Sequence, residues 1–214
     1  MIISAQAANA FIHGYSRILQ QIHAESGQPQ PTQDMHIYQL LIMARNIYMH
    51  TPSLLDQALA TLQATGQLPP EDVVEAVRQL RVSQWVYLKD TRYYSVFMHP
   101  TEQAAYAVQG LTNRLREVIG GTCALIEVGM TSYAGHYISD SLIAKVVWLG
   151  PQYKRELNQK LAQLRQAGHF YASPPATDAQ AGQNIHDGHC PSHQSIPHQG
   201  RMAAAGDLPV ERLL

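Results

Sequence analysis

Cysteine and long apolar runs are both scarce in this sequence. The only two cysteines among 214 residues, Cys123 and Cys190, lie far apart, and no apolar run is longer than the five residues that begin at Leu40. Two distant cysteines do not predict a disulfide framework, so we expect a reducing, cytoplasmic location. A run of five is far below the roughly 20 residues that span a bilayer, so we expect no membrane segment.

An excess of positive charge is also missing. Fifteen Lys and Arg stand against sixteen Asp and Glu, which gives a formal net charge of −1. A protein that binds nucleic acid over its whole surface is usually basic, so any such site here has to be a local patch.

Common enzyme signatures do not occur in the sequence. It contains no glycine-rich phosphate loop, no HExxH, no CxxC and no GxSxG. His136, Ser139 and Asp140 are the residue types of a hydrolytic triad, but neighbours on one short strand alternate between its faces. We predict a protein that is not an enzyme and that has no cofactor and no metal site; an enzyme whose site carries no recognisable motif is a weaker alternative.

The first half of the chain has helical spacing of its apolar residues. Pro52 suits the first turn of one helix and Gly66 its end, Pro70 suits the start of the next, and Asp34 is a candidate N-cap. Together with the apolar stripes, these signals predict helices at 4–24, 34–49, 51–66 and 68–84.

After these helices the period changes. Trp85, Tyr87, Tyr94, Val96 and Met98 alternate on either side of the polar stretch KDTR (89–92), which predicts a β-hairpin. Three helices followed by a hairpin resemble the winged helix-turn-helix superfamily over about residues 34–100, most closely in VVEAVRQLRVSQWVYLKD (73–90). The resemblance implies a recognition helix at 68–84, a wing, and contact with DNA.

The expected DNA contacts come from the third helix and the wing. The start of that helix carries Glu71, Asp72 and Glu75, which repel phosphate. Residues beyond these acids have the side chains that bind bases or phosphate, and we predict a nucleic-acid site at Arg78, Gln79, Arg81, Lys89 and Arg92.

The second half of the chain predicts a long helix at 101–119, strands at 122–130 and 137–150, a helix at 151–168 and a final strand at 169–173. The two longer strands are apolar and are expected to complete a sheet with the wing. From Ser173 the chain is rich in Pro, Gly, Gln and Ser, so we expect a disordered tail whose histidines bind metal only weakly.

The predicted fold is α+β: a mainly helical winged-helix-like core with a hairpin wing, a small C-terminal α+β unit and a disordered tail. The expected divisions are 1–33, 34–121, 122–173 and 174–214. The function predicted from these features is that of a DNA-binding regulator acting as a homodimer, with Phe11, Ile18, Leu111 and Leu115 in the dimer interface. The alternative is a non-catalytic adaptor that turns the acidic helix face to a protein partner.

Overall fold

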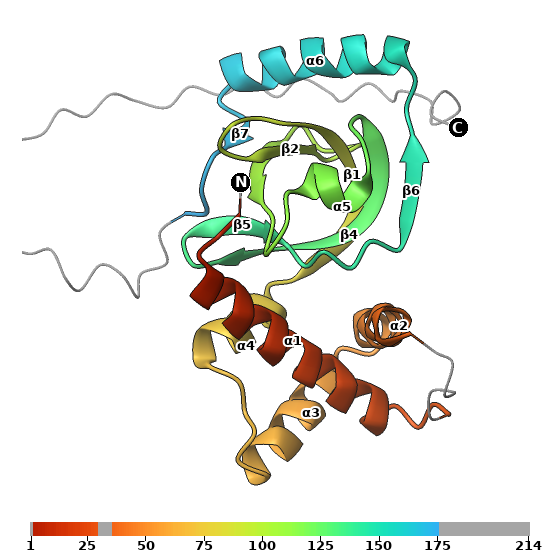
Figure 1. Ribbon diagram of the computed structural model, residues 1–214, viewed down its shortest axis with the longest axis vertical. Coiled ribbons are helices and arrows are strands. Elements are labelled where there is room, and N and C mark those ends of the chain that lie inside the picture. Colours follow the sequence, from red (N-terminus) through yellow and green to blue (C-terminus); the bar gives the residue numbers. More distant parts are fainter. Residues whose placement is uncertain (1, 30–35, 176–214) are drawn as a thin grey trace, which may run out of the picture. The chain divides into compact units, whose positions relative to one another are not determined.

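The computed structural model describes residues 2–29 and 36–175. Asp34 and, from residue 176 onward, the predicted tail with its histidines lie outside the described residues. The described part is a mixed α and β fold (Figure 1) whose elements are α1 (Ala5–Glu25), α2 (Ile37–His50), α3 (Ser53–Ala64), α4 (Glu71–Arg78), β1 (Arg81–Asp90), β2 (Ser95–Met98), β3 (Ala105–Gln109), α5 (Leu115–Ile119), β4 (Ala124–Tyr133), β5 (His136–Ser139), β6 (Lys145–Trp148), α6 (Pro151–Gln166) and β7 (Phe170–Tyr171). Every helix in it is too short or too polar to span a bilayer.

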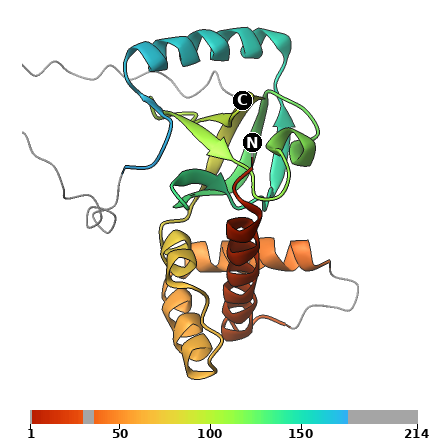
Figure 2. The same ribbon diagram turned by 60° about the vertical axis from the view of Figure 1, so that its left-hand side comes forward.

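Five of the strands close into a barrel. β1 pairs with β2, β2 with β3, β3 with β5, β5 with β4, and β4 returns to β1; only the β3–β5 pair is parallel. β6 extends the sheet from β4, and β7 pairs with the start of β3 (Figures 1 and 2). Closure pairs both sides of each barrel strand, which removes the exposed edges that an open sheet would have.

Alternation along β1 sorts its side chains between two apolar clusters. Trp85 and Tyr87 pack in one cluster with Phe97 of β2, while Val86 and Leu88 pack in the other. The second cluster includes Leu161 and Leu164 of α6, so this helix covers the outer face of β1 and β2 (Figure 1). The helix begins at Pro151, as the sequence predicts, and proline is well suited to this first position.

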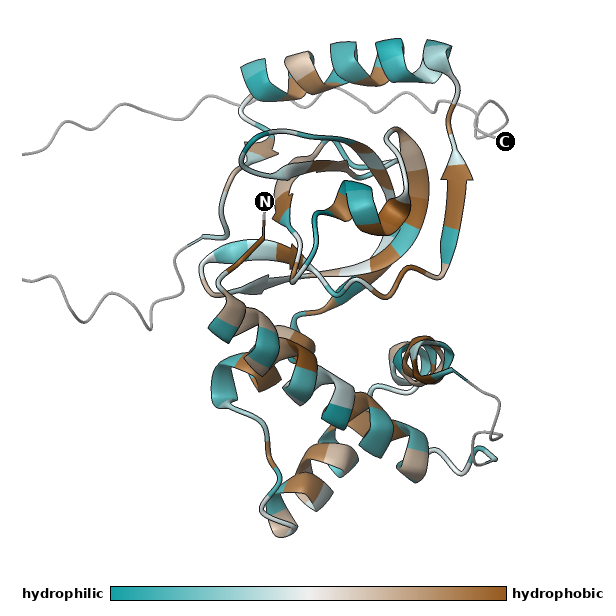
Figure 3. Cartoon of the chain, viewed as in Figure 1, coloured by the Kyte–Doolittle hydropathy of each residue, from teal (hydrophilic) through white to brown (hydrophobic). Residues whose placement is uncertain are grey.

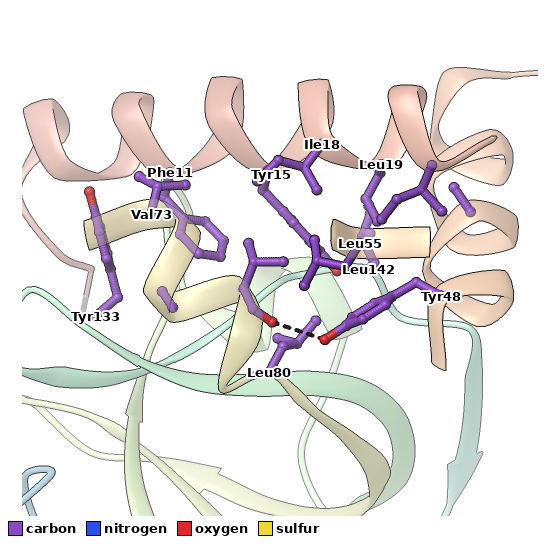
Figure 4. Packing of buried hydrophobic residues seen from close by; sticks show 14 of the residues in the cluster. Phe11, Tyr15, Ile18, Leu19, Tyr48, Leu55, Val73, Leu80, Tyr133 and Leu142 are labelled. Carbon is purple, nitrogen blue, oxygen red and sulfur yellow. Dashed lines mark hydrogen bonds between the residues drawn. The ribbon is translucent and has the colours of Figure 1, made fainter. Parts of the chain in front are cut away.

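The N-terminal helices pack around α1. Its first turn is capped by Ser4, whose hydroxyl accepts a hydrogen bond from the Ala7 N–H. The apolar stripe expected from the sequence is buried against α2, α3 and α4, and Phe11 reaches Tyr133 of β4 with 5.2 Å between ring centroids. Figure 4 shows this core, with the Tyr48 hydroxyl bonded to the Val77 carbonyl at 3.3 Å.

A buried ion pair joins the helices to the barrel. Arg45 of α2 lies 3.1 Å from the carboxylate of Asp140, which follows β5, and both side chains are fully buried. The same carboxylate accepts hydrogen bonds from the Tyr15 hydroxyl at 3.2 Å and from the N–H groups of Gly129 and Leu142 at 3.0 Å each. Burial raises the pKa of Asp140, and Arg45 opposes that shift.

The structure corrects the helix predicted at 101–119. Residues Ala105–Gln109 form β3, and only Leu115–Ile119 are helical. The alanines of this stretch suit a helix, but pairing with β2, β5 and β7 decides the conformation. Gly110 ends the strand at a point where any Cβ would collide with the carbonyl oxygen of Asn113, so only glycine fits there.

Two further boundaries differ from the prediction. The third helix ends at Arg78 and β1 begins at Arg81, so the strand starts four residues before Trp85. The strand predicted at 137–150 is two short strands, β5 and β6, separated by the segment that contains Asp140. The hairpin itself and its pairing with the C-terminal strands are confirmed.

The residues expected at a dimer interface are buried within the chain. Phe11 and Ile18 have no exposed surface, Leu111 retains 4% and Leu115 retains 1%. The stripe of α1 packs against α2, α3, α4 and the barrel, and Leu111 and Leu115 pack in two apolar clusters, so these four side chains have almost no surface to offer a second copy.

We predict that Arg45→Met destabilises the fold by about 3–5 kcal/mol, because the Asp140 carboxylate would be left buried without its cation. Urea denaturation at neutral pH measures the change. Arg17→Met is the control, since Arg17 only donates to a backbone carbonyl at the surface, that of Gln67. Equal midpoints for the two variants would contradict the role given to the ion pair.

We also predict that Gly129→Ala costs about 1–3 kcal/mol, because the new methyl group would overlap the Asp140 carboxylate and lie 2.9 Å from Leu80 Cδ1. Thermal unfolding measures the effect. Gly150→Ala is the matched control, because a Cβ at Gly150 meets no atom within 4 Å. Similar melting temperatures for both variants would show that β4 can move to make room.

Candidate nucleic-acid interface

The five predicted site residues lie at two ends of β1. Arg78 ends α4, Gln79 follows it and Arg81 begins β1, whereas Lys89 is near the end of β1 and Arg92 is in the turn to β2. Arg81 and Lys89 are eight positions apart on one extended strand, roughly 26 Å along the chain at about 3.3 Å per residue. The structure therefore forms two groups from these residues.

The group at the start of β1 is neutralised by neighbouring acids. Arg78 forms a salt bridge with Asp56 at 2.9 Å, and Gln79 donates to the Glu75 carboxylate at 2.7 Å. Arg81 binds both carboxylate oxygens of Glu102. Phosphate would have to displace these carboxylates before it could bind here.

The group at the far end of β1 has neutral partners. Lys89 donates to the side-chain oxygen of Asn158 in α6 at 2.7 Å, and the guanidinium of Arg92 lies 5.5 Å from the ring centroid of Tyr93. Arg165 of α6 donates to the Tyr94 hydroxyl at 3.2 Å. Within residues 2–29 and 36–175, none of these three cations has a carboxylate within 4 Å.

Helix α6 brings further cations to the same place. Lys154, Asn158 and Arg165 are spaced i, i+4 and i+11, which puts them on one flank of the helix, and Arg155 is adjacent. Because Asn158 contacts Lys89 and Arg165 contacts Tyr94, this flank faces the β1–β2 hairpin. We call the set the basic surface and define it as Lys89, Arg92, Lys154, Arg155 and Arg165, together with Tyr93 and Tyr94.

The regional charge agrees with this position. Residues 1–80 contain three Lys or Arg and six Asp or Glu, whereas residues 81–175 contain ten and six. The balance over the whole chain therefore conceals an acidic helical part and a basic barrel part. No local signal in the sequence places α6 beside the hairpin, so the predicted site did not include its cations.

A row of aromatic rings lies near the start of β1. Trp85 packs edge-to-face on His99 and Tyr106, with centroids 5.2 and 5.7 Å away, and Tyr106 stacks on Tyr171 at 5.3 Å. Arg81 lies 5.3 Å from the Trp85 ring centroid. β7 carries Tyr171 to this row by pairing with β3, a contact between distant segments that no spacing in the sequence predicts.

His99 is hydrogen-bonded on both ring nitrogens in this row. Its Nδ1 accepts the Glu102 N–H at 3.1 Å, and its Nε2 lies 3.3 Å from the Ser83 hydroxyl. Burial lowers the pKa of His99. Nε2 also lies 3.1 Å from a guanidinium nitrogen of Arg81, and this cation disfavours a second positive charge on the ring.

The residues of a hydrolytic triad do not converge. His136 bonds to the Gln109 side chain at 3.1 Å, and the Ser139 hydroxyl accepts the Ser141 N–H at 3.1 Å. Asp140 is bound to Arg45. Among the described residues, no three His, Cys, Asp or Glu side chains are grouped so that they could hold a metal ion, and the tail histidines lie outside them.

Comparisons with known proteins give no relative for this chain: no family model, no curated protein and no solved structure matches it.

We predict that the His99 imidazole titrates below the ordinary value of 6.5. The folded state then binds this proton less readily than the unfolded state, so His99 contributes stability above about pH 6.5 that is lost as the pH falls. NMR titration of the imidazole resonances measures the midpoint, and His99→Gln assigns the signal. A midpoint at or above 6.5 would contradict the lowered pKa.

Proposed function

We propose that this protein binds single-stranded DNA on the basic surface and acts as a regulator by occupying the DNA strand. The observation that carries the proposal is the meeting of Lys89 and Arg92 of the hairpin with the cationic helix α6 around an exposed tyrosine. Tyr93 is 57% exposed, which leaves most of its ring free to stack on a ligand. Grooves lined by cations with aromatic rings are how proteins hold single strands, since phosphate binds the cations and bases stack on the rings.

The barrel supports the same proposal by analogy. A closed, five-stranded, mostly antiparallel barrel resembles the oligonucleotide/oligosaccharide-binding fold, in which the loop between the first two strands contributes to the ligand site. Arg92 and Tyr93 lie in the corresponding loop here. Fold alone does not establish function, so the analogy is secondary to the cations and rings.

Helix α4 offers much weaker support for a DNA site. The winged-helix resemblance would present its N-terminal half to DNA, but Glu71, Asp72 and Glu75 are acidic and the following cations are paired. Its apolar face is buried, with the Thr131 hydroxyl of β4 donating to the Ala76 carbonyl at 2.6 Å. We therefore base the proposal on the barrel and α6, and keep Lys89 and Arg92 from the predicted site.

A single strand fits this surface better than a duplex does. Reading the major groove requires a protruding helix or a two-stranded ribbon. The hairpin turn is short, running only from Thr91 to Tyr94, and α6 lies flat along the barrel (Figure 2). A flexible strand can follow such a shallow surface from α6 to Tyr93.

We predict that the protein binds a labelled oligodeoxythymidine of about 16 nucleotides, the upper site size for one such barrel. Arg92→Ala and Arg165→Ala should each weaken binding and reduce the slope of log K against log salt by about 0.7, since each removes one phosphate contact. Tyr93→Ala should cost about 1–3 kcal/mol of stacking. Fluorescence anisotropy at several salt concentrations measures all three.

Arg78→Ala is the matched control, because Arg78 already pairs with Asp56 on the helical part. Binding that Arg78→Ala reduces and Arg92→Ala does not would return the site to α4. Duplex DNA and single-stranded RNA of the same length are the competitors. Folded protein that binds none of these at low salt would overturn the proposal.

A second candidate function is a protein-interaction adaptor, favoured by a groove along α2. This groove has a volume of about 740 Å³ and is lined by apolar Ile42, Met43, Ile47 and Leu54 between polar side chains such as Asn46 and His50. An amphipathic helix from a partner would bury its apolar face in such a groove. Absence of nucleic-acid binding in every test above would favour the adaptor function.

A further inference from the structure

We infer that β6 is the surface on which this protein pairs with a second copy of itself. Among the described residues, β6 is the last strand of the sheet and pairs on one side only, with β4 (Figure 1). Val146, Val147 and Trp148 are 37%, 42% and 53% exposed, and β6 is largely apolar in Figure 3. An edge strand with exposed apolar residues is a template for pairing with another strand.

The backbone of β6 has hydrogen-bonding groups that point away from β4. The Leu149 N–H donates to the Cys123 carbonyl at 2.9 Å, and this pair continues the β4–β6 register, in which Leu125 lies opposite Val147. Because antiparallel strands alternate, Val147 also bonds toward β4, whereas the N–H and C=O groups of Val146 and Trp148 point to the open side.

These free groups determine how two copies can pair. Antiparallel pairing of identical strands requires a twofold axis perpendicular to the sheet, and such an axis passes through a residue pair. If the axis passed through the Val146 pair, the Ala144 N–H would have to donate to the second copy. That N–H already donates to the Glu127 carbonyl at 3.0 Å. An axis at Val147 uses only the free groups of Val146 and Trp148, so every backbone hydrogen bond across the axis comes from these two residues.

The side chains are compatible with this register. Val146 of each copy lies opposite Trp148 of the other and on the same face of the sheet, which makes a cross-strand pair of a β-branched residue with an aromatic ring. Val147 lies opposite its own counterpart. Lys145, the charge that would otherwise protect the edge, lies opposite Leu149 at the end of the ladder. The strand is therefore complementary to itself, which favours a second copy over an unrelated partner.

Pairing would also enlarge the basic surface, and this consequence rests on the proposed function. α6 begins at Pro151, shortly after β6 ends at Trp148. A twofold axis perpendicular to the sheet keeps both α6 helices on the same face. Lys154 and Arg155 of the two copies would then belong to one larger cationic surface able to hold a longer strand.

Charge substitutions at the axis test the inference without nucleic acid. In the proposed register, Val147→Lys places two like charges opposite each other, and so does Val147→Glu, so each variant should be monomeric while the native protein is a dimer at tens of micromolar. An equimolar mixture of the two variants should form a heterodimer, because the lysine of one copy then faces the glutamate of the other. Sedimentation velocity measures each state, and circular dichroism checks folding.

Leu68→Lys is the matched control, since Leu68 is 44% exposed in the connection between α3 and α4 and its substitution should leave the dimer intact. A native protein that remains monomeric at hundreds of micromolar would overturn the inference and leave β6 to a different partner. Dimers that persist in both Val147 variants would place the interface elsewhere, and folded variants that fail to combine would overturn the register. Each readout is independent of DNA binding, so the proposed function can fail separately.

Discussion

The ion pair between Arg45 and Asp140 is the contact on which the arrangement of the described residues depends. It joins α2 to the segment between β5 and β6, and Tyr15 of α1 donates to the same carboxylate. Two charges without solvent are costly unless each is paired, and removal of one partner exposes that cost. Gly129 is part of the same arrangement, because its missing Cβ leaves room for the carboxylate on the β4 backbone. The helices and the barrel are therefore held together by groups whose individual replacement destabilises the fold.

This connection separates two kinds of surface. The helical part is acidic, and the cations near its junction with β1 are paired with Asp56 or Glu102. The barrel part is basic, and α6 covers the outer face of β1 and β2 while its charged flank meets the hairpin. Because Leu161 and Leu164 cover that face of the strands, the surface left for a ligand is on α6 and in the turn between β1 and β2. The proposed DNA site is a consequence of where α6 packs.

The open edge at β6 has the opposite character. Each of the five barrel strands pairs with two others, whereas β6, among the described residues, pairs only with β4. Val146 and Trp148 have exposed apolar side chains, and their peptide groups point away from β4 toward that edge. Pairing with a second copy there would bury the apolar side chains, supply hydrogen bonds to the free peptide groups and bring the two basic surfaces together. The proposed binding and the proposed assembly would thus be linked by the short connection between β6 and α6.

Local signals in the sequence determined the helices of the first half, the hairpin, and the helix that begins at Pro151, because caps, prolines and apolar periods act over a few residues. They also predicted Lys89 and Arg92 as site residues, and the proposed function keeps these two. The helix predicted at 101–119 was wrong because its alanines favour a helix locally, while β3 is formed by partners far away in the chain. Closure of the barrel, the pairing of Arg45 with Asp140 and the position of α6 beside the hairpin join residues many positions apart. Only the tertiary structure decided these features, since a single sequence records the residue types of such contacts but not which of them meet.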